Sequence, residues 1–345
     1  MSKKSKSSKE SKNSKENSLD AERRVAVEAV LLASGLCRTV QANLVSDESM
    51  SKKDRSPVTV ADFGAQAVVT QVLRQHFPDI PMVGEEDAAE LRDSGNAELT
   101  SKVVANVREV VSGLEEAEIL DLIDYGTYEG GGRGRHWTLD PIDGTKGFLR
   151  LDQYAVALAL IEDGEVVLGV LGCPNLPVKA GEPDGAKGCL FIAVKGGGAS
   201  MRTLDDAKES AIHVTEIRDT AQASFCESVE SAHSSQSDSA RVAELLGIEA
   251  PPYRIDSQCK YAAVSRGDAS IYLRLPTRKD YEEKIWDHAA GAMVIREAGG
   301  RVTDVSGKDL DFSIGRTLRD NKGVIVTNGH VHDRVIAAVG EVLGL

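Results

Sequence analysis

Apolar residues recur with a helical period in two stretches near the start of the chain. The first stretch is 20–44, with Ser18 or Asp20 as its candidate cap. The second is 56–77, which leads from a loop into a helix that Pro78 ends. These patterns predict two consecutive amphipathic helices.

Strand patterns follow the two helical stretches. The strongest is 154–174, where two apolar runs meet at Asp163-Gly164, a pair typical of a hairpin turn. Further strands are expected within residues 80–87, 129–148 and 187–199. Antiparallel strands flanked by helices predict an α+β first half.

The pattern changes after about residue 210, where short strands and helices alternate. A helix is expected at 237–246, another within 285–300, and a buried strand within 323–329. This alternation predicts an α/β second half. We therefore expect a domain of residues 19–208 and a second domain of residues 209–345.

Charge separates the first 18 residues from the rest of the chain. They contain six Lys, two Glu and almost no apolar residues, which predicts a disordered Lys/Ser-rich tail. The whole chain carries −13, so the tail of +4 leaves −17 on the remainder. An acidic body disfavours nucleic-acid binding, although the tail leaves a nuclear or RNA-binding role open. If the substrate is anionic, divalent cations are the natural way to offset the repulsion.

Cysteine usage and hydropathy indicate a reducing compartment. No apolar run approaches the length of a membrane span, and no secretory signal pattern is present. We expect an intracellular protein, with the cytoplasm favoured and organellar or nuclear locations left open. The five scattered cysteines, which show no CxxC spacing, are predicted to be buried reduced thiols: Cys37, Cys173, Cys189, Cys226 and Cys259.

Acidic residues stand at the ends of several predicted elements, and each has an ordinary structural explanation. Thr59 and Asp62 fit a helix capping box, and Asp287 fits a helix cap. Asp140 and Asp143 fit an Asx turn. Taken one at a time, these explanations are favoured over a functional one.

The stretch WTLDPIDGT changes that balance because it places two acids on a stiff bend. Pro141 fixes one backbone angle, so the carboxylates of Asp140 and Asp143 can converge on one point. Gly144 and Thr145 are expected to begin a short helical turn, whose free N–H groups suit a phosphate. Oxygen ligands beside a phosphate-binding turn are typical of Mg²⁺ sites.

Other motifs give weaker signals. GGGRGR (130–135) lacks the strand and helix context of a dinucleotide or Walker site, so a flap or simple turn is preferred. The histidines show no zinc spacing. His288 is expected to pack or cap its helix, and His233 to be either a ligand contact or a surface residue.

Three motifs together resemble the lithium-sensitive, Mg²⁺-dependent phosphatase superfamily that includes inositol monophosphatase. They are GEED (84–87), WTLDPIDGT (137–145) and WDHAAG (286–291), in the order typical of that superfamily. The resemblance extends from about residue 20 to the C-terminus. It implies a layered αβαβα sandwich.

Further segments resemble the 3′(2′),5′-bisphosphate nucleotidase branch of this superfamily. Inositol monophosphatases usually carry Thr-Asn-Phe after DPIDGT, whereas this chain has Lys146-Gly147-Phe148. It departs from the branch in its Lys/Ser tail and at Asp280, where glycine is usual. The segments similar to the branch are PVTVADFGAQ (57–66), ESVESAHSS (227–235), DSQCKYA (256–262) and residues 272–291.

The resemblance implies a monomeric hydrolase that uses two or three Mg²⁺ ions. It would remove the 3′-phosphate of adenosine 3′,5′-bisphosphate, giving AMP, and would also act on 3′-phosphoadenylyl sulfate. Asp62 and Thr145 would activate the attacking water. The implied metal ligands are Glu85, Asp140, Asp143, Asp287 and the carbonyl of Ile142, and the implied substrate contacts are Gly144, Thr145, His233, Ser257, Lys260 and Arg274.

Three alternatives remain open at this stage. The same fold serves an inositol polyphosphate 1-phosphatase, which would share the metal ligands. A regulator that binds the bisphosphate without hydrolysing it would not need Asp62 and Thr145. A nucleic-acid-binding protein would act through the lysine-rich tail, but the acidic body argues against it, so we expect neither a nucleic-acid nor a membrane partner.

Overall fold

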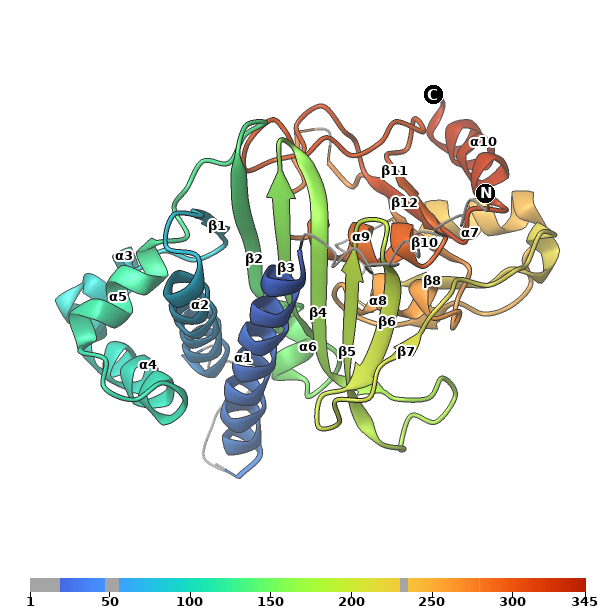
Figure 1. Cartoon of the computed structure of the whole chain (residues 1–345). Coiled ribbons are helices and arrows are strands. Elements are labelled where there is room, and N and C mark those ends of the chain that lie inside the picture. Colours follow the sequence, from blue (N-terminus) through green and yellow to red (C-terminus); the bar gives the residue numbers. More distant parts are fainter. Residues whose placement is uncertain (1–18, 47–55, 230–234, 279) are drawn as a thin grey trace, which may run out of the picture.

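The computed structural model describes residues 19–46, 56–229, 235–278 and 280–345. The predicted tail at residues 1–18 and His233 lie outside this part of the chain. The fold consists of layers in which helices and two sheets alternate (Figure 1). The αβαβα sandwich implied by the sequence motifs is therefore confirmed.

A seven-stranded sheet forms the centre of the first half. Its strands follow chain order, β1 runs parallel to β2, and the later neighbours pair antiparallel as a meander. The expected hairpin at Asp163-Gly164 joins β3 to β4. The strands are β1 (Met82–Gly84), β2 (Arg135–Asp143), β3 (Ala155–Glu162), β4 (Glu165–Pro177), β5 (Lys187–Val194), β6 (Gly198–Thr203) and β7 (Ser210–Ala211).

Helices cover one face of this sheet and extend past its β1 edge. The two long helices predicted from periodicity, α1 and α2, pack on each other and on the central strands (Figure 1). The helices of this half are α1 (Asp20–Ser46), α2 (Ser56–His76), α3 (Ala89–Arg92), α4 (Ala97–Val110), α5 (Glu116–Asp124) and the short α6 (Thr145–Leu149), with a 3₁₀ turn η1 (Ser94–Asn96).

A five-stranded mixed sheet forms the second half, in the order β11-β12-β10-β8-β9. Helices α8 and α9 lie between the two sheets, and α7 and α10 cover the outer face (Figure 1). The elements are β8 (Phe225–Glu227), β9 (Tyr253–Arg254), β10 (Ile271–Arg274), β11 (Arg301–Thr303), β12 (Val324–Thr327), α7 (Gln236–Leu246), α8 (Cys259–Ser265), α9 (Ala289–Glu297), α10 (His332–Leu343) and the 3₁₀ turn η2 (Thr220–Gln222).

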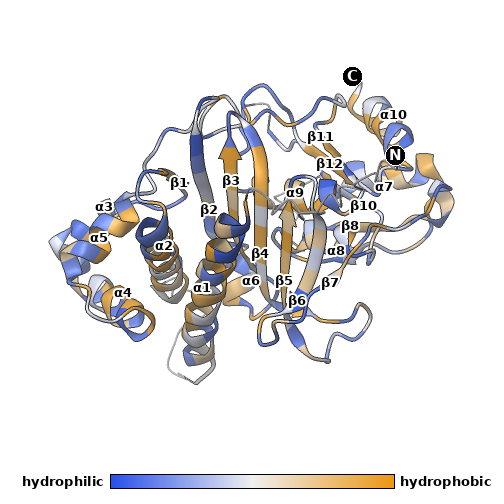
Figure 2. Cartoon of the chain, in the orientation of Figure 1, coloured by the Kyte–Doolittle hydropathy of each residue, from blue (hydrophilic) through white to orange (hydrophobic). Residues whose placement is uncertain are grey.

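Strand β3 shows how the sequence builds the layers. Val156, Leu158 and Leu160 point into the core beneath α1 and α2, whereas the alternate residues, mainly alanines, point toward α9. Successive strand residues face opposite sides, so a strand covered on both faces reads as one continuous apolar run. Figure 2 shows β3 and β4 as hydrophobic strands at the centre of the molecule. The small alanine side chains let α9 approach the sheet closely.

Helix α1 illustrates how a core helix resembles a membrane span. Residues 20–43 are long and apolar enough to cross a membrane by length and composition, contrary to the expectation that no run approaches that length. In the structure α1 packs against α2 and β4, and 56% of its most apolar window is buried. The apolar residues of α1 are thus accounted for by the core.

Two capping explanations for acidic residues are wrong. Helix α2 begins at Ser56, without the expected loop, so Thr59 and Asp62 lie inside the helix and not at its cap. Helix α9 has His288 as its N-cap residue, without a side-chain capping bond, so Asp287 does not cap it. The role of both acids must be sought in what surrounds them.

All five cysteines are buried free thiols, as predicted. The first sheet spans residues 82–211 and the second spans residues 225–327. The division into domains at residues 208 and 209 stays a prediction.

Buried His332 should make stability fall in mild acid. Its ring nitrogens lie 2.9 Å from the Thr327 hydroxyl and 3.0 Å from the Thr303 hydroxyl. Burial, reinforced by the charge of Arg301, lowers the pKa of His332 to about 4. An unfolded histidine titrates near pH 6.5, so the unfolded chain binds a proton first. The contribution of His332 to the free energy of unfolding is at its maximum above about pH 6.5. As the pH falls, it decreases by at most about 1.4 kcal/mol per pH unit, and below about pH 4 it no longer changes.

Urea unfolding between pH 7 and pH 4 measures this effect. We expect His332→Gln to flatten the slope, and His76→Gln, which changes an exposed histidine, to leave it unchanged. An equally steep slope in His332→Gln would contradict the assignment.

Candidate active site

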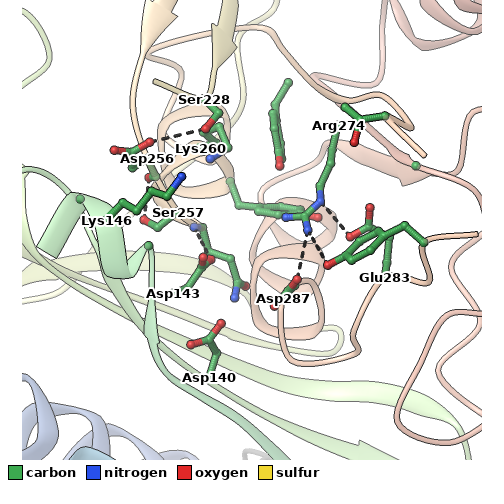
Figure 3. Close-up of a pocket in the computed structure, with 18 of the residues that line it drawn as sticks. Asp140, Asp143, Lys146, Ser228, Asp256, Ser257, Lys260, Arg274, Glu283 and Asp287 are labelled. Carbon is green, nitrogen blue, oxygen red and sulfur yellow. Dashed lines mark hydrogen bonds and ion pairs between the residues drawn. The ribbon is translucent and has the colours of Figure 1, made fainter. Parts of the chain in front are cut away.

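The two halves meet at a cavity of about 560 Å³. Predicted site residues from distant parts of the sequence line it together, and Figure 3 shows Asp140, Asp143 and Asp287 around one common space. Asp62 is not among the residues that line the cavity. The predicted residues that line the cavity are Glu85, Asp140, Ile142, Asp143, Gly144, Thr145, Ser257, Lys260, Arg274 and Asp287.

The DPIDGT bend lies at the floor of the cavity. Strand β2 loses its regular register with β3 between Asp140 and Asp143, which brings both acids to the end of the strand. Gly144 has φ +93°, and a Cβ there would lie 2.9 Å from the Cβ of Ser257. Glycine is therefore required both by the backbone and by the close approach of the second half. Helix α6 starts at the next residue, Thr145, so the predicted helical turn is confirmed.

The carboxylates of the bend repel one another and their neighbours. Asp140 is 2% exposed, its Oδ1 is buried without a hydrogen-bond partner, and burial together with the charge of Glu85 raises its pKa well above the usual range. Burial and the charge of Asp287 raise the pKa of Asp143 to about 6, although Lys260 and Arg274 oppose this. Asp143 also accepts a 2.6 Å hydrogen bond from the Gln258 amide.

Two further acids extend the cluster beyond the bend. Glu85 follows β1 and is open to the cavity, and desolvation together with the charge of Asp287 raises its pKa to about 8. Asp62, on α2, is 6% exposed and its Oδ1 has no hydrogen-bond partner. Burial and the charges of Glu86 and Glu85 raise the pKa of Asp62 well above the usual range. Among the described residues of the first half that line the cavity, Lys146 is the one cation. The cluster is therefore strongly acidic.

Asp287 belongs to a charged network on the opposite wall. The guanidinium of Arg274 lies 2.8 Å from the Glu283 carboxylate and 3.2 Å from that of Asp287 (Figure 3). His288 lies 3.0 Å from Glu283 and 2.7 Å from the Tyr261 hydroxyl. His288 is therefore a buried packing residue, as expected, and it orients Glu283.

Basic and small polar groups form the remaining wall. Lys260, on α8, is 5% exposed, and its ammonium lies 5.2 Å from the centre of the Tyr272 ring. Burial lowers the pKa of Lys260, while Asp143 opposes the shift. Ser257 has φ +64°, and its hydroxyl accepts a hydrogen bond from the Cys259 amide. The second half therefore brings cations to a cavity whose floor is acidic.

Comparison with known proteins identifies this combination of fold and site. The Inositol monophosphatase family model matches residues 17–343 of the chain. The chain belongs to the inositol monophosphatase family. Its structure is also similar to that of an inositol monophosphatase from Anabaena, with a TM-score of 0.60 and 20% identity, covering 94% of this chain and 96% of that one.

Curated relatives within this family share a common name. The chain is 47% identical to a 3′(2′),5′-bisphosphate nucleotidase of Emericella nidulans, over 95% of this chain and 100% of the relative. It is 45% identical to a protein of the same name from Schizosaccharomyces pombe, over 94% and 96% of the two chains. The resemblance to the bisphosphate nucleotidase branch is thus confirmed.

Several residues of this cavity have no counterpart in the site residues predicted from the sequence. Glu283, Gln258 and Asp256 line the cavity. Asp256 is ion-paired with Arg150 of the first half. Gln258 hydrogen-bonds the carbonyl of Trp286 at 2.9 Å. The sequence contained a signal for Glu283, because it lies four residues before the predicted ligand Asp287. The places of Asp256 and Gln258 in the site depend instead on contacts between distant segments.

Proteins of this family generally depend on a metal, and the carboxylates of Glu85, Asp140 and Asp143 that line the cavity are suited to a hard divalent cation. Buried oxygens of Asp62 and Asp140 have no hydrogen-bond partner, and burial together with the negative charge of neighbouring acids raises the pKa values of Glu85, Asp140 and Asp143. Carboxylate and carbonyl oxygens are the ligands that Mg²⁺ prefers. A second grouping, Glu283, Asp287 and His288, has ligand atoms within 4.8 Å of one another, and its two carboxylates are ion-paired with Arg274.

Proposed function

We propose that this chain is a 3′(2′),5′-bisphosphate nucleotidase, a phosphoric monoester hydrolase. It removes the 3′-phosphate of adenosine 3′,5′-bisphosphate to give AMP and phosphate, and it also accepts 3′-phosphoadenylyl sulfate. The observation that carries the proposal is the identity of 45–47% to nucleotidases over nearly the whole chain. The cavity supports it by joining an acidic floor to a basic wall.

The metal ligands we propose are the acids of the floor and Asp287. Asp140, Ile142 and Asp143 lie on β2, Glu85 directly follows β1, and Asp287 comes from the second half. Two or three bound Mg²⁺ ions would lower the pKa of a bound water and neutralise charge on the phosphoryl and leaving oxygens. The chain's own contribution is to fix the ligands in place.

Asp62 and Thr145 are proposed to handle the proton of the attacking water. Thr145 opens α6 beside the bend, and α6 packs against α2, the helix that carries Asp62. The hydroxyl of Thr145 would accept the proton of the water as it passes its own proton to the carboxylate of Asp62, which also holds the hydroxyl in place. The free Oδ1 of Asp62 supplies the acceptor this role needs.

Substrate phosphates would be held by both halves. The amides of Gly144 and Thr145 at the start of α6 would bind the phosphate that is transferred. Ser257, Lys260 and Arg274 would bind the 5′-phosphate portion, because they place positive charge and a hydroxyl on the opposite wall. His233, proposed for the same portion, lies outside the described residues.

Phosphate release from a substrate panel tests the proposal. Adenosine 3′,5′-bisphosphate, 3′-phosphoadenylyl sulfate and inositol 1,4-bisphosphate are compared with and without Mg²⁺ and Li⁺. We expect fast, Mg²⁺-dependent and Li⁺-sensitive release from the first. Preference for inositol 1,4-bisphosphate would identify an inositol polyphosphate 1-phosphatase, and tight binding without release would identify a regulator.

Lys260 should determine recognition of the 5′-phosphate. Lys260→Met removes a charged hydrogen-bond donor, which is worth about 1.5–3 kcal/mol, so KM for the bisphosphate should rise about 10- to 100-fold. Adenosine 3′-monophosphate lacks the 5′-phosphate, so its KM should change little. Steady-state kinetics with both substrates measures the difference. Lys195→Met, at a surface ion pair with Glu165, is the control, and equal losses on both substrates would refute the role.

A further inference from the structure

The strand end that carries Glu85 is held by two side chains that the reaction itself does not use. One comes from Gln66 of α2, which is 0% exposed. Its amide nitrogen donates to the carbonyls of Glu86 at 2.6 Å and Ile123 at 2.7 Å, and its oxygen accepts from the Glu86 amide at 3.1 Å. Both polar ends of the Gln66 side chain therefore bind the backbone of Glu86, the residue that follows Glu85.

Gln66 also ties this strand end to Asp62. The two residues are four positions apart on α2, so they lie on the same face of the helix. A Cβ at Gly84 would collide with the Gln66 amide, so the strand approaches this helix face as closely as glycine allows. Gln66 therefore lies between the helix face that carries Asp62 and the strand end that precedes Glu85.

The second contact comes from Arg316, in the other half of the molecule. Its guanidinium donates to the carbonyl of Gly84 at 2.6 Å, and to those of Gly126 at 3.0 Å and Tyr128 at 2.9 Å. These acceptors belong to the first sheet and the segment beside it. The contact with Gly84 is one residue from Glu85.

Arg316 is at the same time fixed to the segment that carries Asp287. Its guanidinium carbon lies 5.0 Å from the centre of the Trp286 ring, and its carbonyl accepts from the Ile285 amide at 3.1 Å. Trp286 is 7% exposed and directly precedes Asp287. One side chain therefore spans from the residue before Glu85 to the residue before Asp287.

We propose that Gln66 and Arg316 are positioning residues that set Glu85 at its working distance from Asp62 and from Asp287. The inference rests on the proposed function, since it assumes that Glu85 and Asp287 hold a common set of cations. Arginine suits this place because its planar fork donates several hydrogen bonds while its face stacks on an aromatic ring. Lysine reaches one carbonyl and cannot stack in the same way.

Mg²⁺ titration calorimetry of the full chain tests the role of Arg316. Loss of partners that orient metal ligands typically costs 10- to 100-fold in metal affinity. We expect Arg316→Met to weaken Mg²⁺ binding by about that factor and Arg316→Lys to recover only part of it. Arg301→Met, which removes a surface ion pair with Asp333, is the matched control and should bind Mg²⁺ as the unmodified chain does.

A double-mutant cycle separates positioning from general stability. In a Glu85→Gln background the Arg316 substitution should add less than about a twofold effect on Mg²⁺ affinity, because the ligand that it orients is already impaired. In an Asp143→Asn background the full effect should remain. Equal effects in both backgrounds, or a folded Arg316→Met that binds Mg²⁺ normally, would overturn the proposal.

Gln66 supplies an independent check within the first half. Gln66→Met keeps the volume but removes both hydrogen-bonding ends, and it should weaken Mg²⁺ binding and lower kcat together. If Arg316→Met does not fold, Arg316→Lys carries the test through the same cycle. Failure of the unmodified chain to bind Mg²⁺ would instead refute the proposed function, so the two failures are distinguishable.

Discussion

Replacing Asp143 with alanine should abolish Mg²⁺-dependent phosphate release. Asp143 lines the cavity together with Asp140 and Asp287 (Figure 3). A bound metal contributes several kcal/mol of transition-state stabilisation, so loss of a ligand should lower kcat/KM by more than about 10³-fold. Phosphate release from adenosine 3′,5′-bisphosphate at saturating Mg²⁺ measures the loss.

The fold should survive this substitution. Removing one carboxylate relieves repulsion among acids whose pKa values are raised, while it costs the hydrogen bond from the Gln258 amide. Circular dichroism and urea unfolding in the absence of metal check that the variant is folded. Asp184→Ala, in an exposed loop, is the matched control. Turnover near that of the unmodified enzyme would refute the metal role of Asp143.

Asp62→Asn should slow the chemical step far more than it weakens metal binding. Asparagine has nearly the same shape but cannot accept a proton, and general-base catalysis typically contributes about 10²- to 10⁴-fold. We expect kcat to fall within that range, and Mg²⁺ affinity, measured by calorimetry, to change by less than about threefold. Because Asp62 does not line the cavity, it is placed to act through a neighbour such as Thr145.

A matched change at Asp87 controls for loss of charge near the cluster. Asp87 is exposed and its side chain accepts from the Ala89 amide, so Asp87→Asn should leave kcat unchanged. If Asp62→Asn instead loses Mg²⁺ binding along with turnover, Asp62 is a metal ligand and its assignment as part of the base is wrong.

Local sequence patterns predicted the elements whose burial is periodic. The helix expected at 20–44 is Asp20–Ser46, and the turn at Asp163-Gly164 joins the expected hairpin. Caps were less predictable, because Thr59 and Asp62 have the spacing of a capping box inside a helix that starts three residues earlier. Spacing alone does not fix where a helix begins when tertiary packing extends it.

The candidate site likewise combines features that are local in the sequence with contacts between distant residues. The convergence of Asp140 and Asp143 followed from Pro141 and the glycine after it, which are local features. The contact of Arg316 with Gly84 joins residues 232 positions apart, and that of Asp256 with Arg150 joins residues 106 positions apart. No periodicity encodes such pairs, so only the three-dimensional arrangement revealed them.

The cavity lies where the two halves meet, and each half supplies different groups to the candidate site. The first half supplies Asp62, Glu85, Asp140, Asp143 and Thr145, to which we assign hydrolysis. The second half supplies Ser257, Lys260 and Arg274, which we assign to recognition. Substitutions in the second half can therefore change which phosphate ester is bound without changing the residues that we assign to hydrolysis. Asp287 is the exception, because as a proposed metal ligand it would tie the second half to cation binding as well as to recognition.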